Sequence, residues 1–408
     1  MNTFWNLVSY EYKKIFKRKG AVITLILAAA VSLFSVFGTI IGYIYDSNGE
    51  PVMSRYDDMK TDLEYARELS GRAIDTELIM EASEAYSKLE LNSAEKYTDS
   101  EEYENYARKY SEIYSIVRSV YNTSSELFDV QTFGNMTKEQ ADNFYEIRRQ
   151  KQEQAIMQTN MSDAAKQSVI GLDSGVEKPI VFEASEGYTR FFAIMYTTGI
   201  IIAVAAAIIF APLFSGEYTS GADSLILSSK HGKSLLVWAK LFVSFTLSAG
   251  LSVILTVLTY AECMAIWGTD GADAAIQLQV PMMSYPLTMG QCALLYSVSV
   301  FAACIMTAAL TAMLSAAIKT PSGTIVIMSV IIIAPMMLNV SEDIVWLYKL
   351  FCLLPSNMMA FWCIIDSIQF ELFGLVIRPY IFTPVFALVA AVLFGISAYR
   401  IFGKKQVN

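Results

Sequence analysis

One short polar stretch, residues 214–234, lies between two long apolar runs and contains Glu217, Asp223, Lys230, His231 and Lys233. The stretch closes with Gly232-Lys233-Ser234, which matches the end of a phosphate-binding loop. The full motif needs a further glycine at position 227, but Leu227 stands there and no strand precedes it. We therefore expect no ATP binding by this chain through such a loop.

The single histidine limits the remaining catalytic chemistry. His231 is the one histidine in 408 residues, so a multi-histidine metal site and a Ser-His-Asp site are both excluded. The chain also contains no Gly-x-Ser-x-Gly motif. We predict that the protein is not an enzyme and has no catalytic residue, no metal site and no cofactor of its own.

Residues 214–234 instead suggest a docking element. Ser220 and Asp223 have the spacing of a capping box, which predicts a short helix carrying Leu225, Ile226 and Leu227. The apolar face of such a helix has nothing in the loop to cover it, which favours docking over a solvated connector. The candidate docking residues are Glu217, Tyr218, Gly221, Asp223, Lys230, His231 and Lys233.

Composition places the chain in a membrane. The sequence is 54% hydrophobic and only 17% charged, which is too apolar for a soluble enzyme of this length. The charge is uneven, because residues 46–189 hold 29 acidic and 15 basic side chains, whereas the rest of the chain is basic. No basic surface remains for nucleic acid, so we expect none to bind. All five cysteines lie outside residues 46–189, which argues against a disulfide scaffold there.

The apolar runs predict an all-α polytopic membrane protein with six transmembrane helices. Residues 1–20 have an apolar stripe at helical spacing, interrupted by Glu11, and end in five cations, which is typical of a cytoplasmic interface helix. Residues 21–45 carry no charge and exceed the ~20 residues that a helix needs to cross a bilayer. The second to sixth spans are predicted at residues 191–213, 235–267, 289–318, 324–340 and 380–402, within the membrane part 190–408.

Residues 46–189 are long enough for a domain of their own, which we place outside the cell. Apolar and tyrosine residues at spacings of three and four predict helices near residues 78–89 and 103–120, and a third helix at 139–157. A little strand is expected near residues 169–182. The tyrosine stripe at 103–110 is interpreted as a core seam, with a peptide-binding surface as the alternative.

Residues 341–378 contain apolar pieces too short to cross a bilayer, on either side of Leu354-Pro355-Ser356-Asn357. These predict re-entrant outer helices before the last span. Cations gather on the segments that would be cytoplasmic: residues 13–19, Lys230, Lys233, Lys319, Arg400, Lys404 and Lys405. By the positive-inside rule, both termini are cytoplasmic and residues 46–189 are extracellular.

The loop also resembles a known family. Glu217-Tyr218-x-x-Gly221, followed by a short helix and by Ser229, Lys230, Gly232 and Lys233, is similar to the loop of permease subunits of ABC type 2 exporters. The resemblance implies that residues 214–234 are a coupling helix resting on a separate cytoplasmic ATPase, which would bind the ATP. It also implies a second permease chain, identical or different, and a pathway lined by the second and fifth spans. We expect Glu217 to accept hydrogen bonds from backbone amides, or to pair with a cation such as Lys233 or one on the ATPase.

The spans lack ionisable residues near their middles, which counts against an ion-coupled transporter. The function that this pattern favours is export or flipping of an amphipathic peptide, antibiotic or lipid, driven by a partner ATPase. The alternative is a membrane-anchored sensor whose extracellular helical domain binds a ligand.

Overall fold

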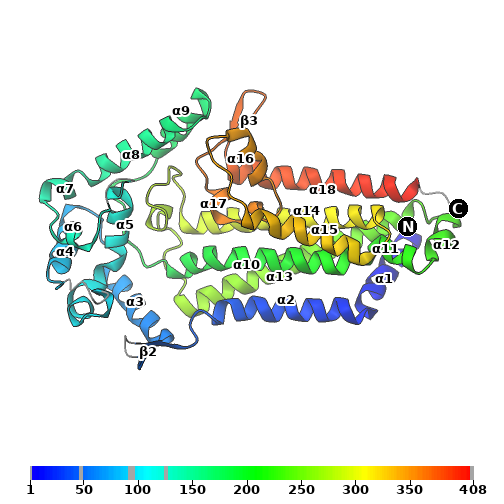
Figure 1. The fold of residues 1–408 in the computed structure, drawn as a ribbon, viewed down its shortest axis with the longest axis horizontal. Coiled ribbons are helices and arrows are strands. Elements are labelled where there is room, and N and C mark those ends of the chain that lie inside the picture. The colour runs from blue at the N-terminus through cyan, green and yellow to red at the C-terminus, as the bar shows by residue number, and fades with distance from the viewer. Residues whose placement is uncertain (1, 46–48, 91–96, 124–126, 405–408) are drawn as a thin grey trace. The chain divides into compact units, whose positions relative to one another are not determined.

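The computed structural model describes residues 2–45, 49–90, 97–123 and 127–404, so that Asp46 and Lys405, which the sequence analysis uses, lie outside the described residues. The chain divides into two compact units (Figure 1). The first, here called the bundle unit, consists of Met1–Val36, Phe191–Glu262 and Leu294–Asn408. The second, the insert unit, consists of Phe37–Arg190 and Cys263–Ala293.

The structure contains five helices that are long and apolar enough to cross a membrane, as expected for a multi-pass membrane protein. They are α2 (Lys19–Phe37), α10 (Glu186–Phe210) with its continuation α11 (Pro212–Thr219), α13 (Leu235–Trp267), α14 (Met289–Ala317) and α18 (Pro379–Gly403). A shorter apolar helix, α15 (Pro321–Ile333), begins with Pro321 in its first turn and runs into the 3-10 turn η5 (Ala334–Met337). The other elements of the bundle unit are α1 (Asn2–Lys17), α12 (Ala222–Ser228), α16 (Val345–Cys352), η6 (Asn357–Met359), α17 (Phe361–Ile364), β3 (Phe370–Leu372) and β4 (Leu375–Ile377).

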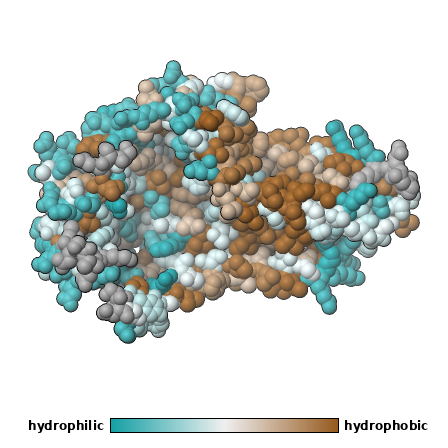
Figure 2. Space-filling view, viewed as in Figure 1, coloured by the Kyte–Doolittle hydropathy of each residue, from teal (hydrophilic) through white to brown (hydrophobic). Residues whose placement is uncertain are grey.

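Small residues and hydroxyl contacts hold the bundle helices together. On α18, Ala387, Ala391 and Ala398 are buried on one face. The hydroxyl of Thr259 lies 3.0 Å from that of Thr198 and 3.3 Å from that of Ser32, which joins α13, α10 and α2. Such faces are typical of helices packed in lipid. Apolar side chains cover much of the bundle unit in Figure 2.

The first predicted span extends beyond the C-terminal end of the helix in the structure. Residues 21–45 were expected to be helical, but α2 ends at Phe37. Gly42 then takes a φ of 112°, which turns the chain into β1 (Tyr43–Tyr45), and β1 pairs with β2 (Pro51–Ser54). The second span begins earlier than predicted, at Glu186, whereas the third has the predicted bounds.

Residues 341–378 form the short helices α16 and α17 around η6, and a hairpin that the sequence analysis did not predict. β3 and β4 pair antiparallel across Phe373 and Gly374, both at positive φ, as a tight primed turn requires. The backbone of η6 is held by α14, because Tyr296 donates from its hydroxyl to the carbonyl of Met359 at 2.7 Å.

The insert unit is mostly helical. Its elements are β1, β2, α3 (Arg55–Leu69), α4 (Thr76–Ser87), η1 (Tyr97–Asp99), the π-helical turn η2 (Tyr103–Ala107), η3 (Arg108–Tyr110), α5 (Ser111–Tyr121), α6 (Val130–Gly134), α7 (Lys138–Asp142), α8 (Phe144–Gln158), α9 (Asp163–Asp173) and η4 (Ile276–Leu278). Polar side chains gather over this unit in Figure 2.

The predicted tyrosine seam holds only in part. Ile113, Val117 and Val120 are fully buried as expected, but Tyr106 is 49% exposed. The π-helical turn η2 inserts an extra residue into the helical repeat, so that Ala107 takes the buried position instead. Tyr103 and Tyr110 pack against the core, which agrees with a seam.

The predicted strand near residues 169–182 is largely wrong. Val169 is a buried residue of α9, a helix that Ser162 caps through the amide of Ala165. Only Val181 makes a strand-like contact, a single bridge to Ala73. Ala165 and Val169 are spaced by four residues and follow a capping serine, which is a helical pattern.

Residues 268–288, left as a short loop between the predicted third and fourth spans, form with their flanks the segment Cys263–Ala293 of the insert unit. Arg148 on α8 is 1% exposed and donates to the carbonyls of Pro281 and Met283, both at 2.6 Å. It also pairs with Asp173 at 2.8 Å. One guanidinium therefore joins α8, α9 and a segment more than a hundred residues later in the chain.

We expect Arg148→Ala to destabilise the insert unit by roughly 3–5 kcal/mol, because the change removes the nearer ion-pair partner of buried Asp173 and the donor to the carbonyls of Pro281 and Met283. Asp173 then keeps only the longer pair to Lys178 at 3.4 Å among the described residues. Hydrogen exchange of the full-length protein in detergent should show faster exchange at residues 276–289. The control is Arg149→Ala, the next residue, which pairs only with exposed Glu146 and Glu153. Equal exchange in the two variants would contradict the role of Arg148.

Candidate functional site

The candidate site is built around Glu217 on α11. Pro212 opens this helix, and α11 is locked to α14 because the hydroxyl of Ser315 accepts from the amides of Phe214 and Ser215 at 2.9 and 3.1 Å. Glu217 is buried on α11. A buried carboxylate is costly unless it is paired, so its partners define the site.

Glu217 lies in an ion-pair network that three helices supply. Lys240 on α13 is 1% exposed and donates to Glu217 Oε1 at 2.7 Å and to Glu11 Oε2 at 3.0 Å. Lys14 on α1 makes a further short ion pair with Glu217. The Lys240 ammonium also lies 5.9 Å from the centre of the Phe214 ring. We call Glu11, Lys14, Glu217 and Lys240 the ion-pair network.

Three charged residues on α1 and just past its end face the bundle. Glu11, Lys14 and Arg18 are spaced by three and four residues, which places them on one face of a helix. Arg18, just past the end of α1, donates from Nη2 to the carbonyl of Ile209 on α10 at 2.8 Å. Glu11 is therefore the buried residue through which α1 reaches Lys240.

The predicted partner of Glu217 was Lys233, a cation on an ATPase, or a set of backbone amides. The structure replaces these with Lys240 and Lys14. The sequence does contain a signal for this network: Glu11 interrupts an apolar stripe, and Lys240 is the single charge in the first half of a long apolar helix. Two opposite charges on apolar faces are expected to pair. The sequence analysis did not recognise this pairing.

The short helix α12 exists as predicted, but the capping box does not. Gly221, at a φ of 70°, precedes α12 and supplies no side-chain cap. The hydroxyl of Ser220 donates backwards to the carbonyl of Gly216 at 2.9 Å, so it closes α11 rather than opening α12. Glycine is needed at 221 because few other residues adopt this conformation.

The apolar face of α12 is not left uncovered, contrary to the prediction. Leu227 is buried in a cluster with Phe214, Phe402 and other apolar residues, and Ile226 packs against the same cluster. Leu225 alone remains outside, 76% exposed. The helix is therefore anchored by one face and offers one leucine to a partner.

Tyr218 joins this cluster rather than a partner. Its hydroxyl donates to the carbonyl of Ala316 at 3.0 Å, and its ring stacks on Phe402 with centroids 5.9 Å apart. Glu217 and Tyr218 thus face two different parts of the bundle from adjacent positions on α11.

The remaining predicted residues lie near the surface. Lys230 and Lys233 are exposed, and His231 and Asp223 are half-buried. Within the described part of the chain, none of these four makes an ion pair, and none contacts Glu217. The turn that carries Lys230, His231 and Lys233 requires glycine at position 232, because a Cβ there would lie 1.7 Å from the carbonyl oxygen of Ile226.

The described residues offer no cluster of three or more His, Cys, Asp or Glu side chains that could hold a metal ion. What the ion-pair network can do is mechanical: it fixes α1, α11 and α13 to one another, and α12 follows α11 directly in the chain.

The chain matches no family model, no curated protein and no solved structure. The class of protein that the fold defines is therefore a helical multi-pass membrane protein with a polar insert.

We expect Lys240→Ala to destabilise the bundle unit by roughly 3–5 kcal/mol, because the change removes the buried ammonium that Glu11 and Glu217 share. Among the described residues, Glu217 then keeps its ion pair with Lys14, whereas Glu11 keeps none. Thermal unfolding of the purified protein in detergent should show the loss. The control is Lys233→Ala, which removes an exposed lysine a few residues earlier in the chain and should unfold like the wild type. Adding Glu11→Gln to Lys240→Met should recover stability relative to Lys240→Met alone; a double variant no more stable than the single one would argue against the network.

Proposed function

We propose that this chain is the permease subunit of an ATP-binding-cassette exporter, with α12 as its coupling helix. The observation that carries the proposal is the position of α12. This helix exposes Leu225 and follows α11, on which Glu217 is paired with lysines of α1 and α13. A helix that only reversed the chain would need no such anchor. A helix that receives force from a partner does.

The proposal includes six spans, with α15 and η5 as the fifth. At about 1.5 Å per α-helical and about 2.0 Å per 3-10 residue, their 13 and 4 residues extend about 28 Å. A typical hydrocarbon core is about 30 Å thick, so the segment falls about 2 Å short, a mismatch that local thinning of the bilayer accommodates. Val326, Val330 and Ile333 are exposed and apolar, which suits contact with lipid.

The proposed orientation follows from charge. α1, the turn after α12 and the turn after α14 carry lysines, and these segments would be cytoplasmic. The insert unit would lie outside the cell, and the segment Cys263–Ala293 within it carries Asp270 and Asp273 but no cation.

In the proposed mechanism, two permease chains form the pathway in the membrane and two cytoplasmic ATPases bind and hydrolyse ATP. Closure of the ATPases would press on α12, and the ion-pair network would pass that movement to α1 and α13. The substrate would be amphipathic, a peptide, an antibiotic or a lipid, since the spans offer an apolar path. No nucleic acid takes part.

Topology is tested by cysteine labelling of intact cells. A membrane-impermeant maleimide should label Ser100→Cys in the insert unit and should reach Leu225→Cys only after the cells are opened. The wild type is the control, because its five cysteines are buried. Labelling of Leu225→Cys from outside would reverse the proposed orientation.

Coupling is tested on the complex purified from its native membrane. We expect an ATP-hydrolysing subunit to co-purify, and Leu225→Asp to weaken its binding by placing a charge in an apolar contact. Glu217→Gln should keep the ATPase bound but lower transport per ATP hydrolysed, because the neutral amide pairs weakly with Lys240 and Lys14.

Asp223→Asn, a change on α12 outside the ion-pair network, is the control and should leave transport and hydrolysis coupled. Purification of a stable, folded chain without any ATPase would favour the alternative function, a membrane-anchored sensor.

A further inference from the structure

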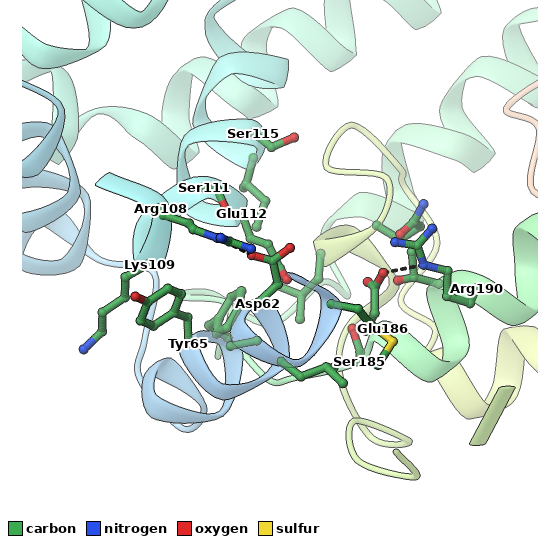
Figure 3. Close-up of a pocket in the computed structure, with 18 of the residues that line it drawn as sticks. Asp62, Tyr65, Arg108, Lys109, Ser111, Glu112, Ser115, Ser185, Glu186 and Arg190 are labelled. Atoms are coloured by element: carbon green, nitrogen blue, oxygen red, sulfur yellow. Dashed lines mark hydrogen bonds and ion pairs between the residues drawn. The ribbon is translucent and has the colours of Figure 1, made fainter. Parts of the chain in front are cut away.

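The insert unit contains a cavity of about 350 Å³, drawn in Figure 3, that no step of the proposed transport cycle uses. Its wall is formed by α3, η3, α5, the start of α10 and the residues around η4. The volume lies within the range of small-molecule binding sites. All of these residues belong to one compact unit.

Three carboxylates from three different helices line the cavity. They are Asp62 on α3, Glu112 on α5 and Glu186 at the start of α10. Two of them are already paired: Asp62 accepts from Arg108 Nε at 2.8 Å, and Glu186 accepts from Arg190 Nε at 2.6 Å. Glu112 makes no ion pair with any described residue and opens into the cavity.

The cations of the cavity wall are saturated with carboxylates. Arg108 is 5% exposed and, besides Asp62, it also binds Asp58 and Glu104. Lys109 pairs with Glu68 at 2.8 Å. The wall and its ion-pair partners together hold six carboxylates against three cations, so the field in the cavity favours a positive ligand.

The raised pKa of the Glu112 carboxyl agrees with its lack of an ion-pair partner among the described residues. Glu112 is exposed to solvent where it lines the cavity, yet the dense protein around its carboxylate, with a smaller contribution from the nearby charges of Glu186 and Asp62, raises its pKa from 4.5 to about 7. Burial also raises the pKa of Asp62, although the hydrogen bond from Arg108 opposes the shift. An added cation beside Glu112 would stabilise the ionised form.

The rest of the wall indicates the kind of cation. Leu63, Ile116 and Phe182 form an apolar side, and the hydroxyls of Ser111, Ser115 and Ser185 can accept hydrogen bonds from an ammonium or guanidinium group. Among the described residues, no three acidic groups come close enough to hold a metal ion, which favours an organic cation.

We propose that this cavity binds a small organic cation, an ammonium or guanidinium group on an apolar body, with Glu112 as its counter-ion. The site stands independently of the transporter assignment, because every residue in it belongs to the insert unit.

The test is calorimetric titration of the full-length protein in zwitterionic nanodiscs, with empty nanodiscs subtracted. The probes are phenethylamine and its uncharged isostere 2-phenylethanol. Phenethylamine should bind and 2-phenylethanol should bind at least about tenfold more weakly, since a charge-assisted contact is lost. Equal affinity of the two probes, or no binding of phenethylamine at millimolar concentration, would overturn the proposal without any variant.

Glu112→Gln should weaken phenethylamine binding about ten- to hundredfold while keeping the shape of the side chain. The matched control is Glu139→Gln on α7, an exposed acid that does not line the cavity and should leave the affinity unchanged. If Glu112→Gln has the wild-type melting temperature at pH 5 and still binds phenethylamine with unchanged affinity, Glu112 is not the counter-ion of the ligand.

The pH dependence gives a second readout. Affinity for phenethylamine should rise with pH and level off above about 7, as Glu112 ionises in the free protein. Without ligand, folding holds the Glu112 proton more tightly than the unfolded chain does, so the free energy of unfolding should fall from about pH 4.5 to about 7. Glu112→Gln should flatten both profiles, and unaltered profiles would contradict the role of Glu112.

Discussion

The ammonium of Lys240 is the constraint on which this end of the bundle depends. A lysine 1% exposed within an apolar helix is tolerated only if carboxylates reach it, and Glu11 and Glu217 both do. Because these two acids come from α1 and α11, the position of Lys240 determines where both elements lie against α13. The same requirement explains why an acidic residue interrupts the apolar stripe of α1: at Glu11 the helix meets the buried ammonium of Lys240 rather than apolar side chains.

Residue types and periodicity predicted the helices well where one period runs without interruption. Residues 235–267 were predicted as one helix and are one helix, because no glycine turn or wide helical turn intervenes. The misses have local causes. Gly42 ends the first span region in a hairpin, and one π-helical turn at Tyr103–Ala107 moves Tyr106 to the surface. The ion-pair network was not predicted for another reason: 229 residues separate Glu11 from Lys240, and periodicity shows which face a residue occupies but not which faces meet.

The acidic composition of the insert unit has a structural use beyond solubility. Carboxylates surround Arg108 on three sides, and this buried guanidinium holds α3 against the segment that leads into α5. With its donors engaged in this way, Arg108 has little left to neutralise Glu112. The excess of acid therefore both stabilises the packing of the unit and leaves one carboxylate in the cavity without a counter-ion. Residues 46–189 could be recognised as acidic from the sequence, but the exclusion of Glu112 from the pairs depends on the three-dimensional order of the helices.

The two leucines of α12 show how one short helix can be both fixed and available. Leu225 and Leu227 are two residues apart, which places them on nearly opposite sides of a helix. Leu227 is buried with Phe214 on α11 and Phe402 on α18, whereas Leu225 is free of the bundle. Under the proposed function, a partner that pushes on Leu225 would move α12 as a rigid piece and act on α11 and α18 through Leu227. Since α11 also carries Glu217, the push would reach α1 and α13 through the ion pairs of Glu217. These pairs cannot separate without leaving a buried ion unpaired in apolar surroundings. The network would therefore transmit the movement to α1 and α13.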